Sequence, residues 1–287
     1  MTADFFPPQQ QPLLVRLVQG TCFLLLPKLY GFRVSVSDED VARLRALDDA
    51  RLVYLFNHPT MEDGMAVFGL SARVGQLFHY IVARESFKGI LGKFIQALGC
   101  YSIRRGMGDR ASIAETLRLL KTPRCRVVIY PEGGCSYQND VVQPFRPGAM
   151  QMPLQVMAQL AKKEGPLPDM YLVPVSLKYR YTRPMGQVIE QTLTGLAQAL
   201  GAQHQDGNQY ERLLAIAAQV LNRLETEYGQ PSDTDMDWNP RIERLKHHVI
   251  DQCEKQLGLS SPEHMPIRER VYKIQSLLDS GEVHTDN

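Results

Sequence analysis

The residues best suited to chemistry lie in the segment NHPTMED, residues 57–63, which directly follows an apolar run. Of the seven histidines, His58 is the one at the end of a strand-like run with a carboxylate, Asp63, five residues on. Five residues along a straight helix would turn Asp63 about 140° away from His58. A turn through Pro59 can instead return the carboxylate to the imidazole, which would leave the other ring nitrogen as a general base. The alternative is an ordinary strand-to-helix loop with an exposed histidine.

Two adjacent arginines, Arg104 and Arg105, close the segment GCYSIRR at residues 99–105. A guanidinium group is suited to holding a phosphate by paired hydrogen bonds. The alternative is two solvated arginines beyond the end of a strand. Residues 106–111 (GMGDRA) have the G-x-G-x-x-A spacing of a dinucleotide-binding turn, but no acidic residue stands at a strand end about 20 positions later. A dinucleotide site is therefore disfavoured.

A glycine-rich turn, YPEGGCS at residues 130–136, also follows an apolar run directly. Gly133 and Gly134 allow a tight turn, and we expect backbone N–H groups and the carboxylate of Glu132 to face a cleft. The alternative is an ordinary glycine-rich turn. Further along, Pro174 interrupts the apolar run LVPV. Because central strands exclude proline, this run is predicted to be an edge strand, a bulge or the wall of a site.

Strand-like and helix-like runs alternate from residue 51 onward. The strand-like runs are residues 32–37, 51–56, 76–83, 100–103, 126–130 and 170–181. The helix-like runs are residues 12–30, 38–47, 87–98, 109–120 and 148–163, together with one from about residue 62; the first of these is expected to end near Pro27. This alternation predicts an α/β fold with a mainly parallel sheet covered by helices on both faces. The carboxyl ends of its strands, where α/β folds bind ligands, would bring the polar segments together.

The composition is that of an ordinary globular protein, with 44% hydrophobic and 22% charged residues. The five cysteines form no C-x-x-C pair, which disfavours a disulfide framework or a structural zinc site. The net charge of +1 is unevenly distributed, at +7 over residues 1–181 and −6 over residues 182–287. The basic part could meet a phosphorylated cofactor, a nucleic acid or an anionic membrane. After residue 186 only helices are expected, and no internal repeat of 20–50 residues is detected.

In their order and spacing, these segments resemble the glycerolipid acyltransferase family, the lysophosphatidic acid and glycerol-3-phosphate acyltransferase-like enzymes. NHPTMED matches the family's N-H-x-x-x-x-D block, and GCYSIRR matches the block that ends in a phosphate-binding arginine. YPEGGCS is similar to F-P-E-G-T-R-S, and LVPV is similar to the V-P block. PFRPGA, at residues 144–149, is similar to P-F-K-x-G-A. The resemblance covers about residues 50–180.

The resemblance implies an O-acyltransferase, similar to 1-acylglycerol-3-phosphate O-acyltransferase, in phospholipid biosynthesis. It would move a fatty acyl chain from acyl-CoA or acyl carrier protein to a hydroxyl of a glycerolipid such as 1-acylglycerol 3-phosphate. By analogy, His58 is the general base on the acceptor hydroxyl and Asp63 orients it. The residues expected to bind substrate are Asn57, Arg104, Arg105, Glu132, Gly133 and Gly134. Because a thioester is already activated, neither a metal nor a cofactor is expected.

This sequence departs from the family pattern at two positions, where Gly134 and Cys135 replace the Thr-Arg of the third block. One expected phosphate-binding arginine is therefore missing. Either Arg104 and Arg105 compensate for it, or the acceptor is a lipid without a phosphomonoester. A third alternative is a non-catalytic lipid-binding protein on the same fold.

The resemblance and the charge pattern together predict three parts: an apolar, membrane-associating segment (1–37), an acyltransferase domain (38–186) and a helical C-terminal extension (187–287). In the run 12–30, Arg16 and Lys28 leave 11 residues between them, well short of the roughly 20 that span a bilayer.

We therefore expect the first helix to lie on a membrane rather than to cross it. The apolar stripe within residues 87–98, with Lys88 and Lys93 beside it, could lie in the same interface or pack in the core. The expected partners are a membrane surface, a lysolipid acceptor and acyl-CoA or acyl carrier protein, with no nucleic acid. The expected location is the cytoplasmic side of a membrane, as a peripheral or monotopic protein.

Overall fold

The structure of the chain, a computed structural model, describes residues 5–105, 108–164, 169–201, 207–232, 236–262 and 264–280. It divides into two compact units, Met1–Tyr179 and Arg180–Asn287. The strands of the first unit are β1 (Arg51–Phe56), β2 (His79–Ala83), β3 (Cys100–Ile103), β4 (Arg126–Ile129) and β5 (Met170–Val175). Its helices are α1 (Pro12–Leu29), α2 (Asp38–Ala46), α3 (Asp63–Val74), the 3₁₀ turn η1 (Arg84–Ser86), α4 (Gly89–Ala97), α5 (Arg110–Lys121) and α6 (Gly148–Glu164).

The five strands form one sheet in the order β3-β2-β4-β1-β5, and every neighbouring pair is parallel. The predicted α/β class with a parallel sheet is therefore confirmed. Pro174 lies in β5, at the edge of the sheet, opposite Leu55 of β1. An edge strand was one of the three positions that its proline allowed, because there the missing N–H can face away from the ladder.

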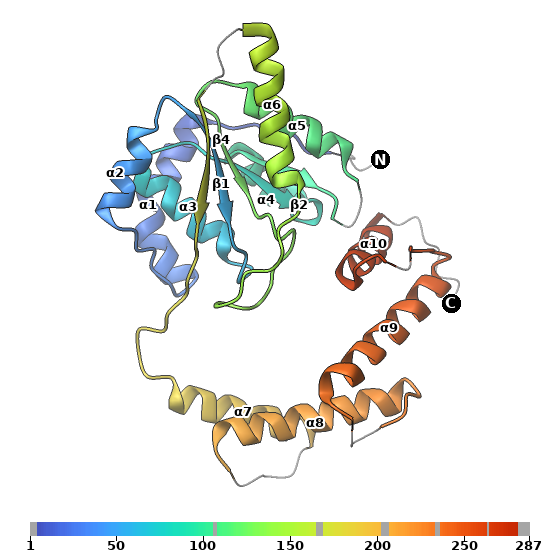
Figure 1. The fold of residues 1–287 in the computed structure, drawn as a ribbon. Helices are drawn as coiled ribbons and strands as arrows, with labels where there is room; N and C mark the ends of the chain where they lie inside the picture. The colour runs from blue at the N-terminus through green and yellow to red at the C-terminus, as the bar shows by residue number, and fades with distance from the viewer. Residues whose placement is uncertain are drawn as a thin grey trace. The chain divides into compact units, whose positions relative to one another are not determined.

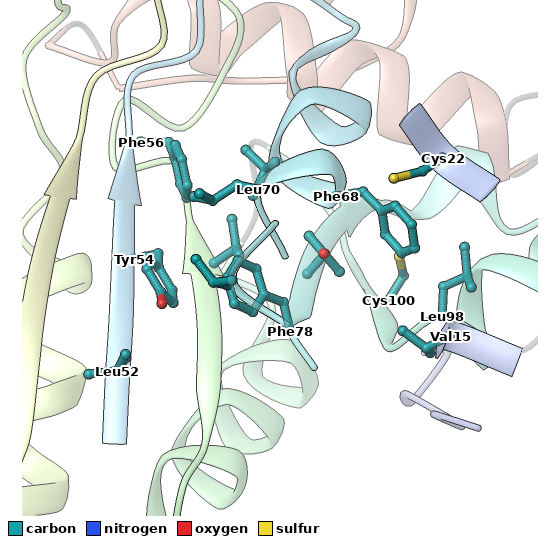
Figure 2. Close-up of a cluster of buried hydrophobic side chains, with 14 of the residues drawn as sticks. Val15, Cys22, Leu52, Tyr54, Phe56, Phe68, Leu70, Phe78, Leu98 and Cys100 are labelled. Atoms are coloured by element: carbon teal, nitrogen blue, oxygen red, sulfur yellow. The ribbon is translucent and has the colours of Figure 1, made fainter. Parts of the chain in front are cut away.

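Helices cover both faces of the sheet, because successive side chains of each buried strand point to opposite sides. On one face, Leu52, Tyr54 and Phe56 of β1 pack in a cluster with side chains of α1, α2 and α3. Figure 1 shows these three helices on one side of the sheet. Figure 2 shows part of this cluster, with Phe56 and Tyr54 on β1 and Cys22 of α1 at its far side. On the other face, Val53 and Leu55 pack with side chains of α5 and α6. The first unit is thus a three-layer sandwich.

One strand predicted near the N-terminal end does not form. The run 32–37 is not a strand; its alternating apolar residues instead pack against the cluster on the α3 side, and Val34 lies against Gly69 of α3. The alternation reports a buried face, but no neighbouring strand is present to pair with it. The helix expected to end near Pro27 continues to Leu29, because a proline near a helix end removes only one backbone hydrogen bond.

The last strand is shorter than predicted and stops at Val175 instead of continuing to residue 181. Its neighbour β1 ends at Phe56, so no ladder is available beyond that point. The chain that follows β5 is held by side chains instead. Asn57 pairs with the backbone of Leu177 in both directions, at 2.9 Å and 2.6 Å. The segment after β5 is therefore fixed beside the end of β1 without being part of the sheet.

The described part of the second unit is helical, as predicted. Its helices are α7 (Gly186–Leu200), α8 (Gln209–Glu227), α9 (Trp238–Gln256) and α10 (Ile267–Ser280). In α8 the buried side chains are Arg212, Ile216, Leu221 and Glu225, and in α9 they are Arg241, Leu245, Ile250 and Glu254. Each member of the second set lies 29 positions after its counterpart in the first. The expectation that no repeat is present is therefore wrong for this unit.

In this repeat, an arginine of one helix donates hydrogen bonds to a buried glutamate of the preceding helix. Arg241 of α9 donates to Glu225 of α8 from Nε at 3.1 Å and from Nη2 at 2.6 Å. Arg270 of α10 donates to Glu254 of α9 through the same atoms at the same distances. Helices α8 and α9 are also each followed, two residues after their last residue, by a glycine in the left-handed conformation. These are Gly229 and Gly258, with φ of 64° and 62°. The sequence does not reveal this repeat directly, because the repeat consists of which face of each helix is buried and not of a run of identical residues.

Candidate active site

The candidate site lies beyond the ends of two neighbouring strands whose following helices lie on opposite faces of the sheet. The helix after β1 is α3, on one face, whereas the helix after the neighbouring strand β4 is α6, on the other face. Loops that leave two adjacent parallel strands for opposite faces open a crevice beyond the strand ends, and α/β folds bind ligands in such crevices. His58 lies in the loop after β1, and residues 130–136 lie in the loop after β4. The fold therefore brings the first and third sequence segments together.

His58 and Asp63 are in contact through their side chains. The imidazole Nδ1 lies 2.7 Å from Oδ2 of Asp63. The Asp63 side chain is completely buried, whereas that of His58 is 21% exposed. Asp63 is the first residue of α3, where a helix N-terminus favours a negative charge. The turn through Pro59 thus returns the carboxylate to the ring, and one side of the imidazole stays open to solvent.

Asp63 receives three further hydrogen bonds. Thr60 donates its amide to Oδ2 at 3.1 Å and its hydroxyl to Oδ1 at 3.0 Å. Tyr179 donates its hydroxyl to Oδ1 at 2.8 Å. An ionised carboxylate only accepts hydrogen bonds, so His58 must donate from Nδ1. Its Nε2 then carries the lone pair that a general base needs.

The loop after β4 holds the backbone of His58 on both sides. The amide of His58 donates to Oε1 of Glu132 at 2.9 Å, and its carbonyl accepts from the amide of Ser136 at 2.8 Å. The ring of Tyr130 stacks on the imidazole, with 4.3 Å between ring centroids and 27° between planes. The two loops of the crevice are therefore locked together around the histidine.

Glu132 does not face a cleft, which corrects the expectation from the sequence. Its side chain is completely buried, and its second oxygen accepts from the amide of Gln143 at 3.1 Å. A buried carboxylate is stable when backbone N–H groups satisfy it. Glu132 thus joins the backbone of the loop after β1 to that of the loop after β4.

Backbone conformation and steric contacts explain why this turn requires glycine at residue 133. Gly133 has a φ of +70°, and a Cβ added there would meet the side chain of Arg146. Its amide closes the turn onto the carbonyl of Tyr130 at 3.0 Å. Gly134 is buried beside it, and Cys135 is partly exposed. Burial raises the pKa of the Cys135 thiol, as do the nearby carboxylates of Asp63 and Glu132, so the thiol lacks the activation of a nucleophile.

Asn57 adjoins His58 in the chain, whereas the two arginines lie farther along the sheet edge. Asn57 is buried, and its side-chain amide donates one hydrogen bond to the segment after β5 and accepts one from it. Arg104 and Arg105 follow β3, which β2 and β4 separate from β1. Three strand spacings amount to about 14 Å, so a ligand must extend along the sheet edge to reach both the arginines and His58.

Acidic side chains lie near both arginines. Arg104 Nε is 3.9 Å from Asp109, the residue that caps α5, and Arg105 is 3.8 Å from Glu85 of η1. Both guanidinium groups are about one-third exposed or less. Gly106 of the disfavoured dinucleotide spacing lies outside the described residues. Within the described ranges, no group of three or more His, Cys, Asp or Glu side chains could hold a metal ion.

Comparison with known proteins gives the family. A family model described as Acyltransferase matches residues 33–178, just over half of the chain and all four sequence segments. The chain belongs to this family. The resemblance to glycerolipid acyltransferases is thereby confirmed, and membership of this family supports acyl transfer to a lipid. No curated protein matches the chain.

Four residues of the candidate site are not among those predicted from the sequence: Thr60, Tyr130, Ser136 and Tyr179. The contact of Thr60 with Asp63 could have been predicted, because a threonine three residues before a carboxylate is a common pattern at the start of a helix. No such pattern marks Tyr179, since it lies 116 positions from Asp63 and the two meet only through the sheet.

Proposed function

We propose that the protein transfers a fatty acyl chain from an acyl thioester, acyl-CoA or acyl carrier protein, to a hydroxyl of a lysolipid such as 1-acylglycerol 3-phosphate. The observation that carries this proposal is the 2.7 Å contact of His58 Nδ1 with buried Asp63. It favours the tautomer whose Nε2 can accept a proton from the acceptor hydroxyl.

The proposed step balances without another reactant. The acceptor O–H gives its proton to Nε2 of His58 while its oxygen attacks the thioester carbon. The tetrahedral intermediate then breaks its C–S bond, and the thiolate takes the proton back from the imidazolium. The products are an ester and a thiol. Because the thioester is activated, the chemistry requires neither a metal nor a cofactor.

The developing oxyanion needs hydrogen-bond donors. In the described part of the third segment, the amides of Gly133 and Ser136 are used within the fold. The amides of Gly134 and Cys135 make no hydrogen bond to another described residue. We assign these two amides as candidate oxyanion donors, which gives Gly134 a role in binding the reacting thioester.

His58→Ala is the direct test of the proposed reaction. General base catalysis typically contributes 10²- to 10⁴-fold, so release of thiol from an acyl thioester should fall by about that factor. Circular dichroism would check that the variant is folded. Undiminished turnover in a folded His58→Ala protein would remove both the mechanism and the assignment of the site.

A second candidate is an acyltransferase for a lipid acceptor without a phosphomonoester. Gly134 and Cys135 stand where the family has Thr-Arg, and acidic groups lie close to both Arg104 and Arg105. A panel of lysolipids with and without the phosphomonoester, analysed by mass spectrometry, separates the candidates. A strict need for the phosphate supports the first, and equal turnover of neutral acceptors supports the second.

A non-catalytic lipid-binding protein on this fold is the least favoured alternative. Four donors converge on a completely buried Asp63, an arrangement that lipid binding alone does not require. Acyl transfer above background by the purified protein would exclude this alternative.

We further propose that the enzyme works at the cytoplasmic side of a membrane, as a peripheral or monotopic protein. By length and composition α1 is the one described helix that could span a bilayer. However, one face of α1 packs in the core, where buried Gln19 donates to Ser71 and to the carbonyl of Gln76. Its opposite face exposes Leu13, Leu17 and Leu24. A helix that is fixed on one side and apolar on the other is suited to lying in an interface.

The start of α1 is joined to α4, which adds to this surface. The amides of Gln9 and Gln11 donate to carbonyls at the end of α4. In α4, Ile90 and Leu91 are 88% and 65% exposed. Lys88 and Lys93 are exposed beside them and can meet anionic headgroups. We call the exposed apolar side chains of α1 and α4 the apolar surface.

A further inference from the structure

Tyr179 reaches the proposed catalytic pair from outside the sheet. Its hydroxyl donates to Oδ1 of Asp63 at 2.8 Å, while Oδ2 of the same carboxylate lies 2.7 Å from Nδ1 of His58. The tyrosine hydroxyl, the carboxylate and the imidazole thus form one hydrogen-bonded chain. Tyr179 belongs to none of the four family segments, since the last of these ends at Val175.

Side chains hold the segment that carries Tyr179 at two points. Asn139, in the loop after β4, accepts from the amide of Tyr179 at 2.7 Å and donates to its carbonyl at 3.0 Å. Asn57 makes the same two-way pairing with Leu177. The ring of Phe32 packs edge-on against that of Tyr179, with centroids 6.0 Å apart. Asparagine side chains from both loops of the crevice therefore hold the backbone that carries the Tyr179 hydroxyl.

The position of this hydroxyl decides the orientation of the carboxylate. A carboxylate that contacts its histidine through one oxygen can rotate unless its other oxygen is also held. Tyr179 and Thr60 hold Oδ1 from two directions, and this keeps Oδ2 directed at the ring. Burial raises the pKa of the Tyr179 phenol, so it remains a donor throughout the neutral pH range.

We propose that Tyr179 is a positioning residue of the acyl transfer, which acts by fixing the Asp63 carboxylate and, through it, the tautomer and orientation of His58. The proposal rests on the proposed function, in which His58 is the base. Tyr179 loses no proton and touches no substrate in this role.

The test compares Tyr179→Phe with Tyr181→Phe. The first removes the bonded hydroxyl and keeps the ring against Phe32, and the second removes an identical hydroxyl from a side chain that is 82% exposed. A hydrogen bond to a charged group is worth about 1.5–3 kcal/mol, so kcat of Tyr179→Phe should fall about 10- to 100-fold. The KM values for donor and acceptor should stay at the wild-type level, because the variant leaves the substrate contacts in place. Tyr181→Phe should behave as wild type.

A second readout needs no turnover. The Nδ1 proton of His58, bonded to Asp63, should give a downfield proton NMR resonance that His58→Ala abolishes. In Tyr179→Phe this resonance should shift or broaden through exchange, although circular dichroism remains that of the wild type. A wild-type resonance together with a wild-type kcat would overturn the proposal. A fall in kcat with an unmoved resonance would also overturn it.

Asn139→Ala provides an independent variant, since it releases the backbone of Tyr179 and leaves the hydroxyl intact. We expect the same loss of kcat and the same change in the resonance. The kcat of the double variant should be no lower than that of Tyr179→Phe alone, because without the hydroxyl the hydrogen bonds of Asn139 have no catalytic group to position. Additive losses would contradict the proposal.

These results separate the two proposals. If His58→Ala keeps full activity, the proposed function fails, whatever Tyr179→Phe does. If His58→Ala is inactive and Tyr179→Phe is indistinguishable from wild type, only the role of Tyr179 fails.

Discussion

At the scale of single residues, Asp63 is the centre of the site. It is completely buried, yet four donors from His58, Thr60 and Tyr179 satisfy it. A buried charge with so complete a set of hydrogen bonds is stable, and it holds its donors in one arrangement. The chemistry proposed for His58 depends on this arrangement, because the donor to Asp63 decides which ring nitrogen keeps its lone pair.

Asp63→Asn tests the choice of tautomer. The amide nitrogen can donate to Nδ1, which would move the ring proton to Nε2 and remove the base. We expect kcat to fall about 100-fold or more while the protein stays folded, since the side chain keeps its shape. Steady-state thiol release is the measurement. Asp140→Asn, a change at an exposed aspartate in the loop after β4, is the matched control and should keep wild-type activity.

At the scale of elements, the loops after β1 and β4 depend on each other. Glu132 bonds the amides of His58 and Gln143, and Ser136 bonds the carbonyl of His58. The turn at Gly133 makes this possible by bringing residues 130–136 back over the end of β1. The backbone of this turn is therefore as important to the site as its side chains.

Gly133→Ala should disturb this turn. The residue has a φ of +70°, and its new Cβ would meet Arg146. A left-handed alanine costs about 1 kcal/mol before the steric contact is added, so the free energy of unfolding should fall by more than that. Urea denaturation would measure it. Gly148→Ala, at the start of α6 where a Cβ meets nothing within 4 Å, is the control and should be neutral or stabilising.

The helical repeat makes a prediction about acid stability. Hydrogen bonds from Arg241 and Arg270 hold the pKa values of Glu225 and Glu254 below their ordinary value of 4.5. A lowered pKa in the folded state means that each ionised carboxylate stabilises the fold above about pH 4.5, and this stabilisation is lost as the pH falls further.

The double variant Glu225→Gln/Glu254→Gln should therefore be less stable than wild type at pH 7 and lose less stability on acidification to pH 3. The only tryptophan, Trp238 in α9, reports unfolding of this unit by fluorescence. Glu243→Gln, at an exposed ion pair, is the control and should follow the wild-type curve. Parallel acid curves for the double variant and wild type would contradict this role of the buried pairs.

At the scale of the whole molecule, the two units differ in charge and in the sequence segments that they contain. The first carries all four family segments and the apolar surface, and it contains most of the basic excess. The second is an acidic array of helices in which each buried glutamate receives an arginine from the next helix. The proposed lysolipid acceptor partitions into membranes, so the apolar surface would bring the site to the bilayer that contains its substrate.

Membrane binding is tested by changing the apolar surface. Leu17→Asp/Ile90→Asp places two acidic side chains among exposed apolar ones, and we expect most co-sedimentation with anionic phospholipid vesicles to be lost. Tyr210→Asp/Leu278→Asp makes the same change in charge at exposed positions of the second unit. Equal loss in both variants would show that charge, rather than the apolar surface, controls binding.

The sequence by itself determined the α/β class and the parallel sheet, and it allowed the pairing of His58 with Asp63 that the structure shows. These are local properties: alternating apolar runs specify strands and helices, and five residues with a proline turn bring two side chains together. For Pro174, the missing N–H limited the sequence to three possibilities, and the strand order shows that it lies at the edge. The local features depend on neighbours in the chain, which the order of residues records directly.

Tertiary structure alone decided the rest of the site. Glu132 was expected to face a cleft, but its burial depends on how the loop after β4 folds over His58. Tyr179 meets Asp63 only because β5 lies beside β1 and because Asn57 and Asn139 hold the chain that follows. Hydrogen bonds between distant residues depend on strand order and loop closure. Apolar periodicity reports which faces are buried, not which partners meet across them.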